Sequence, residues 1–385
     1  MRIAVIEPSI YMSEITYPNR IFAPRTVILS LVEGLVGKGH DVTLFSAPDI
    51  DTKAKLVGGA PELLKGDLLR DKYLSREAIF EYRMQSSIES QHLYALDIIG
   101  KAFQMAINSD FDIIQSDDPL VHSFVHLAKC PTVFTFHDPL PRKDSLDFWF
   151  LNRYKHHNFI SISNAQRKGE PVLNYADNIY HGININSFTA TFSKGEYFAF
   201  MSRLLVQKGP DIAIAAIKQV PGETLKITAD DTHKNTNFVK EKVIPYVDGQ
   251  KIQKLDFLKY DSDKNDFLSK AKALLFPISW EEPFGLVMIE AMSCGTPVIA
   301  YNRGSVAEIV KDGVTGFIID PDDENRPGKE SWIIKKQGID GLVEAIKRID
   351  EIDRSACRRH VEENFTVEKM VDRYEKVYKE LITAQ

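Results

Sequence analysis

Cysteine is scarce in this sequence, and a long apolar run and a surplus of basic charge are both absent. The three cysteines, Cys130, Cys294 and Cys357, are widely spaced over 385 residues, which fits neither a disulfide framework nor a metal motif. No apolar run approaches the length of a membrane-spanning helix. The formal net charge is −6, so the chain also lacks the basic face that nucleic acid binding requires. These absences favour a reduced, cytoplasmic protein with no nucleic acid partner and no transmembrane segment.

The rest of the composition is that of a soluble globular enzyme. Hydrophobic residues make up 44% of the chain and charged residues 26%. The length is too great for one ordinary domain and comfortable for two. A peripheral membrane contact stays open, although residues 53–83 mix charges of both signs and form no clean basic face.

Short apolar runs alternate with helical patterns along both halves of the chain. Strands are predicted at residues 2–6, 41–45, 113–114, 132–136, 159–162, 197–201, 225–228, 254–258, 273–277 and 297–300. Helices are predicted at residues 25–36 and 75–108, after Ser163, from Asp211, and at 366–381. The polar run at residues 187–196 is the predicted linker. The pattern therefore indicates two doubly wound parallel sheets, whose ligands are expected at the carboxyl ends of the strands.

One strand–loop–helix–strand segment, around residues 279–292, concentrates polar groups. Pro283 is predicted to open its helix, where a missing N–H costs nothing, and the Cys294-Gly295 pair to close it. The free N–H groups of Gly285, Leu286 and Val287 would then form an anion site at the helix amino end.

Two carboxylates, Glu282 and Glu290, lie in the same segment, the second inside an otherwise apolar helix. A buried carboxylate needs hydrogen-bond donors or a positive charge. One interpretation is a bound sugar nucleotide, with its ribose on Glu290, its diphosphate on the amides and its sugar on Glu282. The other is that Glu282 caps the helix and Glu290 pairs with a structural Arg or Lys. The residues alone leave both open.

The segment Glu-Pro-Phe-Gly-Leu, followed by Glu-Ala-Met and Gly-Thr-Pro-Val-Ile-Ala, places seven residues between Glu282 and Glu290. It resembles the E-x7-E signature of retaining GT-B glycosyltransferases of family GT4, and the similarity continues through residues 303–308 and 312–317. The resemblance implies a GT-B fold of two Rossmann-like domains facing a cleft. Residues 1–190 and a crossover helix at 366–385 would form the acceptor domain, and residues 191–365 the nucleotide-sugar domain.

The resemblance also implies roles for individual residues. Arg203 and Lys208, just after a strand end, would grip the diphosphate in place of a metal, so no metal or other cofactor is expected. His137, at another strand end, would orient the donor sugar, as would Glu282. These four are the predicted catalytic residues. The predicted nucleotide-sugar ligands are Glu290, Phe284, Gly285, Leu286, Val287, Arg203, Lys208 and Gly304.

The expected donor is a UDP-sugar, with UDP-glucose favoured because the turn Arg303-Gly304-Ser305 resembles that of UDP-glucose-using members. The acceptor is an unidentified sugar or small molecule. One departure from the family concerns residues 21–25, where members commonly have a Gly-Gly loop; Pro24 has no N–H, so the amide of Arg25 or Thr26 would have to contact the phosphate, or the acceptor side is rebuilt.

Two other functions fit the same residues. A sugar-nucleotide epimerase can share the GT-B architecture and would convert the donor without an acceptor. A non-catalytic binding partner of another transferase would bind the donor without cleaving it. Product analysis with donor alone separates the epimerase from a transferase, and measuring donor hydrolysis as well as binding identifies a binding module.

Overall fold

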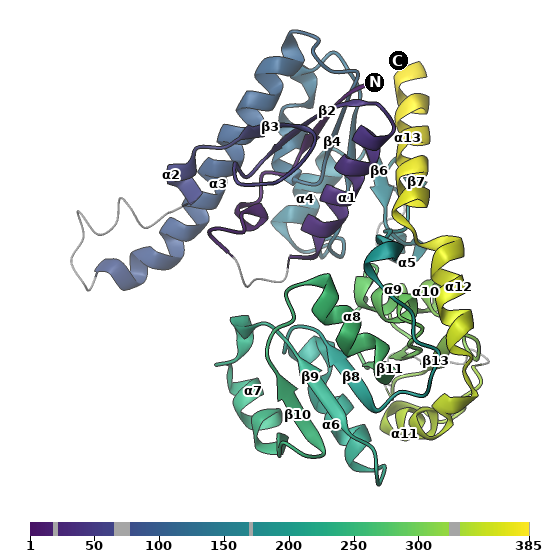
Figure 1. Ribbon diagram of the computed structural model, residues 1–385. Helices are drawn as coiled ribbons and strands as arrows, with labels where there is room; N and C mark the ends of the chain where they lie inside the picture. The colour runs from purple at the N-terminus through teal and green to yellow at the C-terminus, as the bar shows by residue number, and fades with distance from the viewer. Residues whose placement is uncertain (18–21, 65–77, 169–171, 323–331, 385) are drawn as a thin grey trace.

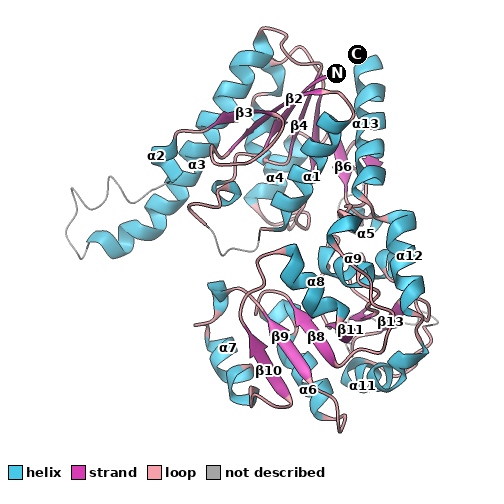
Figure 2. Ribbon diagram, viewed as in Figure 1, coloured by secondary structure: helices cyan, strands magenta, loops and turns pink. Residues whose placement is uncertain are grey.

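Two parallel sheets, each from one half of the chain, organise the computed structural model, which describes residues 1–17, 22–64, 78–168, 172–322 and 332–384. Figures 1 and 2 show two lobes, one holding each sheet. Both sheets carry helices on their faces, as expected when buried parallel strands are connected by crossover helices. The structure is the GT-B arrangement of two Rossmann-like domains that the sequence predicts.

The first sheet has the strand order β3-β2-β1-β4-β5-β6-β7, and all its pairs are parallel. Its strands are β1 (Arg2–Ile6), β2 (Asp41–Ser46), β3 (Lys55–Gly58), β4 (Ile113–Ser116), β5 (Thr132–Thr135), β6 (Asn158–Ser161) and β7 (Tyr175–Asn178). Strands β3 and β7 are not among the predicted strands. Both are four-residue edge strands that are incompletely buried, so neither has the apolar run of a central strand.

The helices of this domain are α1 (Ala23–Gly37), α2 (Pro61–Leu64), α3 (Ala78–Ile107), α4 (Leu146–Arg153) and α5 (Asn164–Arg167). The helix predicted at 75–108 matches α3 from Ala78 onward, and residues 75–77 lie outside the described residues. Ser163 caps α5 as predicted, because its side chain accepts a hydrogen bond from the Gln166 N–H.

The second sheet has the order β10-β9-β8-β11-β12-β13, again parallel throughout. Its strands are β8 (Tyr197–Met201), β9 (Leu225–Thr228), β10 (Ile252–Leu255), β11 (Ala271–Phe276), β12 (Val298–Tyr301) and β13 (Gly316–Ile319). Its helices are α6 (Pro210–Lys218), α7 (Asn237–Lys242), α8 (Asp261–Ser269), α9 (Leu286–Ser293), α10 (Val306–Ile309), α11 (Gly338–Arg348) and α12 (Arg354–Asn364).

Strand β13 is not among the predicted strands, and several predicted boundaries in this domain shift by one to three residues. β10 ends at Leu255, where its partner β9 ends at Thr228, so residues 256–258 are a loop. Helix α9 begins at Leu286, because Gly285 has a φ of 82°, which no residue inside a right-handed helix can have. Pro283 therefore lies in the loop before the helix and does not open it.

The last helix, α13 (Val367–Thr383), lies against α1 of the first domain (Figure 1). Its apolar face, formed by Met370, Val371, Tyr374, Val377 and Tyr378, is buried in the core of that domain. The Tyr378 hydroxyl donates a 3.1 Å hydrogen bond to Gln115 Oε1 on β4. The carboxyl-terminal helix thus completes the amino-terminal domain and links the two lobes.

A buried histidine makes the first domain sensitive to acid. His122 is 2% exposed, stacks on Tyr154 at 5.4 Å, and places its Nδ1 atom 3.0 Å from that of His157. Burial lowers the pKa of His122 to about 3 and that of His157 to about 4. A lowered folded-state pKa means that the stabilisation is complete above the ordinary value of 6.5 and is lost as pH falls through the folded-state value.

We therefore expect that the unfolding free energy of His122→Phe falls less steeply than that of the wild type as the pH is lowered. Between about pH 7 and pH 5 the wild type should lose about 2 kcal/mol more unfolding free energy than the variant, because each bound proton contributes about 1.4 kcal/mol per pH unit. Urea unfolding at the two pH values measures this difference. The exposed His126 provides a matched control, since His126→Phe should leave the slope unchanged. Equal slopes in wild type and His122→Phe would contradict the expectation.

Candidate functional site

A cavity of about 500 Å³ lies between the two domains, at the carboxyl ends of both sets of strands. The first domain contributes the loop before α1 together with His137, Asp138 and His181. The second contributes residues after β8, β9, β10 and β11 and the amino end of α9. Most of the predicted site residues line this one cavity: His137, Arg203, Lys208, Glu282, Phe284, Gly285, Leu286, Val287 and Glu290.

Lys208 and Glu282 form a buried ion pair in the wall of the cavity. The Lys208 Nζ atom lies 2.6 Å from Glu282 Oε2, and the two residues are 7% and 8% exposed. The Trp280 indole N–H donates a 2.9 Å hydrogen bond to the same oxygen, and the ammonium lies 4.3 Å from the centre of the indole ring. Burial lowers the pKa of Lys208, while the Glu282 carboxylate raises it. An ammonium group has three donors, so Lys208 keeps donors for a ligand while it holds Glu282.

Positive groups converge where the chain enters α9. Arg203 follows β8 and is near enough to Lys208 to disfavour its charge, and Lys208 ends a short 3₁₀ helix, Val206–Lys208. Opposite them, Gly285 turns the chain so that the helix starts at Leu286 with its amino end on the cavity. An arginine fork, a lysine and a helix amino end together suit an anion with more than one phosphate.

Glu290 faces the same cavity from inside α9, and its partner is Lys264 on α8. The Lys264 Nζ atom lies 3.2 Å from Glu290 Oε1 and 3.4 Å from Asp261 Oδ1. The nearby Glu290 carboxylate raises the pKa of Lys264 against the opposing effect of burial. Of the two interpretations of Glu290 that the sequence leaves open, this contact is the pairing with a structural lysine. Glu290 can still bind a ligand, because both residues line the cavity and a carboxylate can accept several hydrogen bonds.

Gly304 differs from its expected role. Its N–H donates a 2.7 Å hydrogen bond to Glu281 Oε2, and it does not line the cavity. It lies behind the Glu282 loop with a φ of 55°, and a Cβ atom there would be 2.2 Å from Glu282 O. The next residue, Ser305, donates from its N–H to Glu282 O at 2.9 Å and from its hydroxyl to Phe284 O at 2.7 Å. The turn therefore supports the loop that carries Glu282, because the backbone can approach so closely only at a glycine.

Phe284 is 2% exposed and forms part of an aromatic contact between the domains. Its ring packs on those of Tyr180 and Phe365 at about 6 Å and edge-on against His181 at 4.9 Å. Leu286, the first residue of α9, touches the hydrophobic clusters of both domains. The anion-binding end of α9 is thus held at the domain junction.

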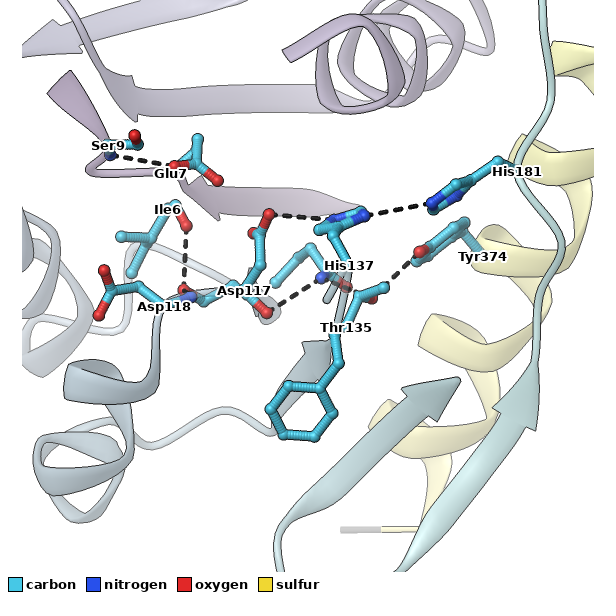
Figure 3. Close-up of polar contacts among 12 residues, drawn as sticks. Ile6, Glu7, Ser9, Asp117, Asp118, Thr135, His137, His181 and Tyr374 are labelled. Atoms are coloured by element: carbon cyan, nitrogen blue, oxygen red, sulfur yellow. Dashed lines mark hydrogen bonds and ion pairs between the residues drawn. The ribbon is translucent and has the colours of Figure 1, made fainter. Parts of the chain in front are cut away.

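The His137 side chain is already engaged by the protein (Figure 3). Its Nε2 atom lies 3.0 Å from Asp117 Oδ2, and its Nδ1 atom lies 3.3 Å from His181 Nε2. Burial lowers the pKa of His137 to about 4, so the ring is neutral near pH 7. Both ring nitrogens thus lie beside protein atoms, and the residue lines the cavity in which the donor sugar is expected.

The loop that replaces the Gly-Gly sequence of the family lines the cavity from Phe22 to Thr26, and Ile21 lies outside the described residues. The Arg25 N–H donates to Phe22 O at 3.2 Å, so this amide serves the first turn of α1. The Arg25 guanidinium pairs with Glu14 at 2.9 Å, and Glu14 lies 3.9 Å from Lys259 of the other domain. Charged side chains thus meet across the cleft here.

Sequence reasoning missed Asp117, His181, Trp280 and Lys264 as members of the site. His181 and Asp117 each follow a strand end, β7 and β4, which is a usable signal; β7 itself was not predicted. Trp280 and Lys264 enter the site only through packing and through the pairing of α8 with α9, for which the sequence carries no signal.

Neither a metal site nor a membrane span is found in the described part of the chain. No group of three or more His, Cys, Asp or Glu side chains there could hold a metal ion. None of the helices in the described ranges combines the length and the apolar character needed to cross a membrane.

Comparison with known proteins gives matches over both domains. The family model "Glycosyl transferases group 1" matches residues 184–329, and the model "Glycosyltransferase Family 4" matches residues 25–169. YtcC of Bacillus subtilis, named as a glycosyltransferase, is 28% identical over 232 residues, which cover 53% of this chain and 54% of YtcC. The chain thus spans about half the length of that relative.

Solved structures match along the whole chain. Sucrose-phosphate synthase from Thermosynechococcus elongatus has a TM-score of 0.71 at 18% identity, with 100% of each chain covered. Anabaena Alr3699/HepE, solved in complex with UDP-glucose, has a TM-score of 0.67 at 17% identity, covering 99% of this chain and 100% of that one. At these identities the two structures show a shared fold.

Proposed function

Since the chain belongs to the group 1 glycosyl transferases, with the GT-B fold, we propose that it transfers a hexose from a nucleotide sugar to a hydroxyl group of an acceptor, with retention at the anomeric carbon. The observation that carries this proposal is the convergence of Arg203, Lys208 and the amino end of α9 on one interdomain cavity. The expected donor is UDP-glucose, a ligand that the structurally similar HepE holds in its solved complex.

The leaving diphosphate gains negative charge as the glycosidic bond breaks. Arg203, Lys208 and the amides at the start of α9 would stabilise that charge from fixed positions, which is preorganised electrostatic catalysis. These groups supply the positive charge that a metal ion supplies elsewhere, so the proposal involves no metal and no other cofactor.

The two carboxylates would position the donor. Glu290, held by Lys264, would accept hydrogen bonds from the ribose hydroxyls, and Glu282, held by Lys208 and Trp280, from the sugar hydroxyls. Neither carboxylate acts as a nucleophile in this scheme. The acceptor would enter from the first domain, on the face that the leaving group vacates, and domain closure would exclude water.

Thermal denaturation with a panel of nucleotides tests the donor class. UDP and UDP-glucose should raise the melting temperature by a few degrees, because a ligand that binds only the native state stabilises it. UMP, which lacks the second phosphate, should raise it less, and GDP-mannose and ADP-glucose less than UDP-glucose. A shift with none of the sugar nucleotides would contradict the proposal. Release of UDP from UDP-glucose, with analysis of the sugar product, then separates transfer and hydrolysis from epimerisation and from binding alone.

A further inference from the structure

A buried histidine in the cavity wall, His181, has one ring nitrogen without a partner. The residue follows β7 and is 4% exposed, and its Nδ1 atom has no hydrogen-bond partner among the described residues. A buried polar atom without a partner costs about 1–3 kcal/mol, so such an atom in a ligand cavity points to a ligand group that satisfies it.

The other ring nitrogen of His181 faces a protein neighbour. His181 Nε2 lies 3.3 Å from His137 Nδ1, and His137 Nε2 lies 3.0 Å from Asp117 Oδ2. Glu7 lies beside Asp117, and burial together with the neighbouring carboxyl group raises the pKa of Glu7. These neighbours hold the His181 ring through its Nε2 side.

The chain of contacts continues to His181 (Figure 3). His181 Nε2 lies 3.3 Å from His137 Nδ1, which leaves Nδ1 as the ring nitrogen with no partner among the described residues. A neutral imidazole has one donor and one acceptor nitrogen. Burial lowers the pKa of His181 well below its ordinary value, so the ring stays neutral. The unpartnered Nδ1 suits a ligand hydroxyl, which can both donate and accept a hydrogen bond.

The position of His181 indicates which part of the ligand carries this hydroxyl. Its ring packs edge-on against Phe284, and the next residue, Gly285, begins the proposed diphosphate site. The transferred sugar is covalently attached to the diphosphate and so lies beside it. We propose that His181 Nδ1 forms a hydrogen bond with a hydroxyl of the donor sugar, and that Asp117 and His137 are positioning residues that hold the His181 ring. This inference rests on the proposed function.

Two isosteric variants separate the two ring nitrogens. His181→Gln keeps an amide near the Nε2 position, which faces His137, and removes the polar atom at the Nδ1 position. His181→Asn places a carbonyl oxygen near the Nδ1 position and loses the contact with His137. Calorimetric titration of each variant with UDP-glucose and with UDP measures the sugar contact separately from the nucleotide contact.

We expect His181→Gln to weaken UDP-glucose binding about 3- to 10-fold, the range for one net hydrogen bond, and to leave UDP binding within about twofold. His181→Asn should bind UDP-glucose more tightly than His181→Gln. His122→Gln is the matched control, since His122 is an equally buried histidine of the same domain that does not line the cavity; both affinities should be unchanged.

Wild-type affinity for UDP-glucose in His181→Gln would overturn the inference, and so would an equal loss for UDP-glucose and UDP, which indicates a structural role. Neither result contradicts the proposed function, because the wild-type protein would still bind UDP-glucose. A wild-type protein that binds neither UDP-glucose nor GDP-mannose would instead overturn the proposed function, and the inference with it.

Discussion

Lys208→Met is expected to lower the rate of UDP release from UDP-glucose by about 100- to 1,000-fold, the effect of removing one preorganised charge-stabilising donor. Methionine keeps the length of the aliphatic stem but removes the ammonium, which lies 2.6 Å from Glu282 and faces the proposed diphosphate site. The variant also leaves the Glu282 carboxylate buried without its cation. Breaking such a pair should lower the unfolding free energy by about 3–5 kcal/mol.

Because this variant changes both catalysis and stability, a second ion pair of the same domain serves as the control. Lys272 lies 2.6 Å from Glu223, with the two side chains 16% and 22% exposed, and neither residue lines the cavity. Lys272→Met should cost stability by a smaller amount and leave turnover unchanged. Steady-state kinetics and urea unfolding of both variants separate the two effects. Turnover of Lys208→Met within about tenfold of wild type would remove Lys208 from the leaving-group role.

Gly304→Ala is expected to displace the loop that carries Glu282, although Gly304 itself does not line the cavity. A Cβ atom at Gly304 would lie 2.2 Å from Glu282 O and 2.4 Å from Glu282 N, both backbone atoms that cannot rotate away. The φ of 55° adds strain for any residue with a side chain. We expect a loss of at least about 2 kcal/mol in unfolding free energy and of at least about tenfold in kcat/KM.

The variant Gly249→Ala separates the effect of the steric clash at Gly304 from the effect of the left-handed backbone conformation. Gly249 has a φ of 73°, and a Cβ atom there would have no heavy atom within 4 Å. Gly249→Ala should therefore show the cost of the left-handed backbone alone, about 1 kcal/mol, and leave kinetics unchanged. If both variants lost the same stability and both kept wild-type kcat/KM, Gly304 would be an ordinary turn glycine with no role in supporting the site.

The prediction of α9 shows where local sequence signals fail. The almost entirely apolar side chains of this segment correctly predict a buried helix that Cys294 closes, but the helix does not open at Pro283. The helix starts three residues later, after Gly285 with its φ of 82°, and Ser305, distant in sequence, holds the loop before it by donating to the carbonyl oxygens of Glu282 and Phe284. A local preference for helix initiation cannot anticipate a contact from another turn.

The prediction for Glu290 shows a different limit. Its position in an apolar helix correctly indicated a buried carboxylate that needs a partner, and left a ligand and a lysine as alternatives. The structure supplies Lys264 from α8, at 3.2 Å, on the wall of the ligand cavity. The sequence contains many lysines, and only the packing of α8 against α9 selects one of them.

By itself, the sequence determined the class of fold and the segment around which the site forms. Apolar runs of strand length alternating with helical patterns permit little other than parallel sheets, and the sequence already predicts free amides at Gly285, Leu286 and Val287 near the start of a helix. The tertiary structure alone decided which charges pair, as Lys208 does with Glu282, and that His137 turns toward Asp117 and His181. The reason is physical: strand and helix formation depends on neighbours along the chain, whereas the partner of a buried polar group depends on which elements the fold brings within about 3 Å.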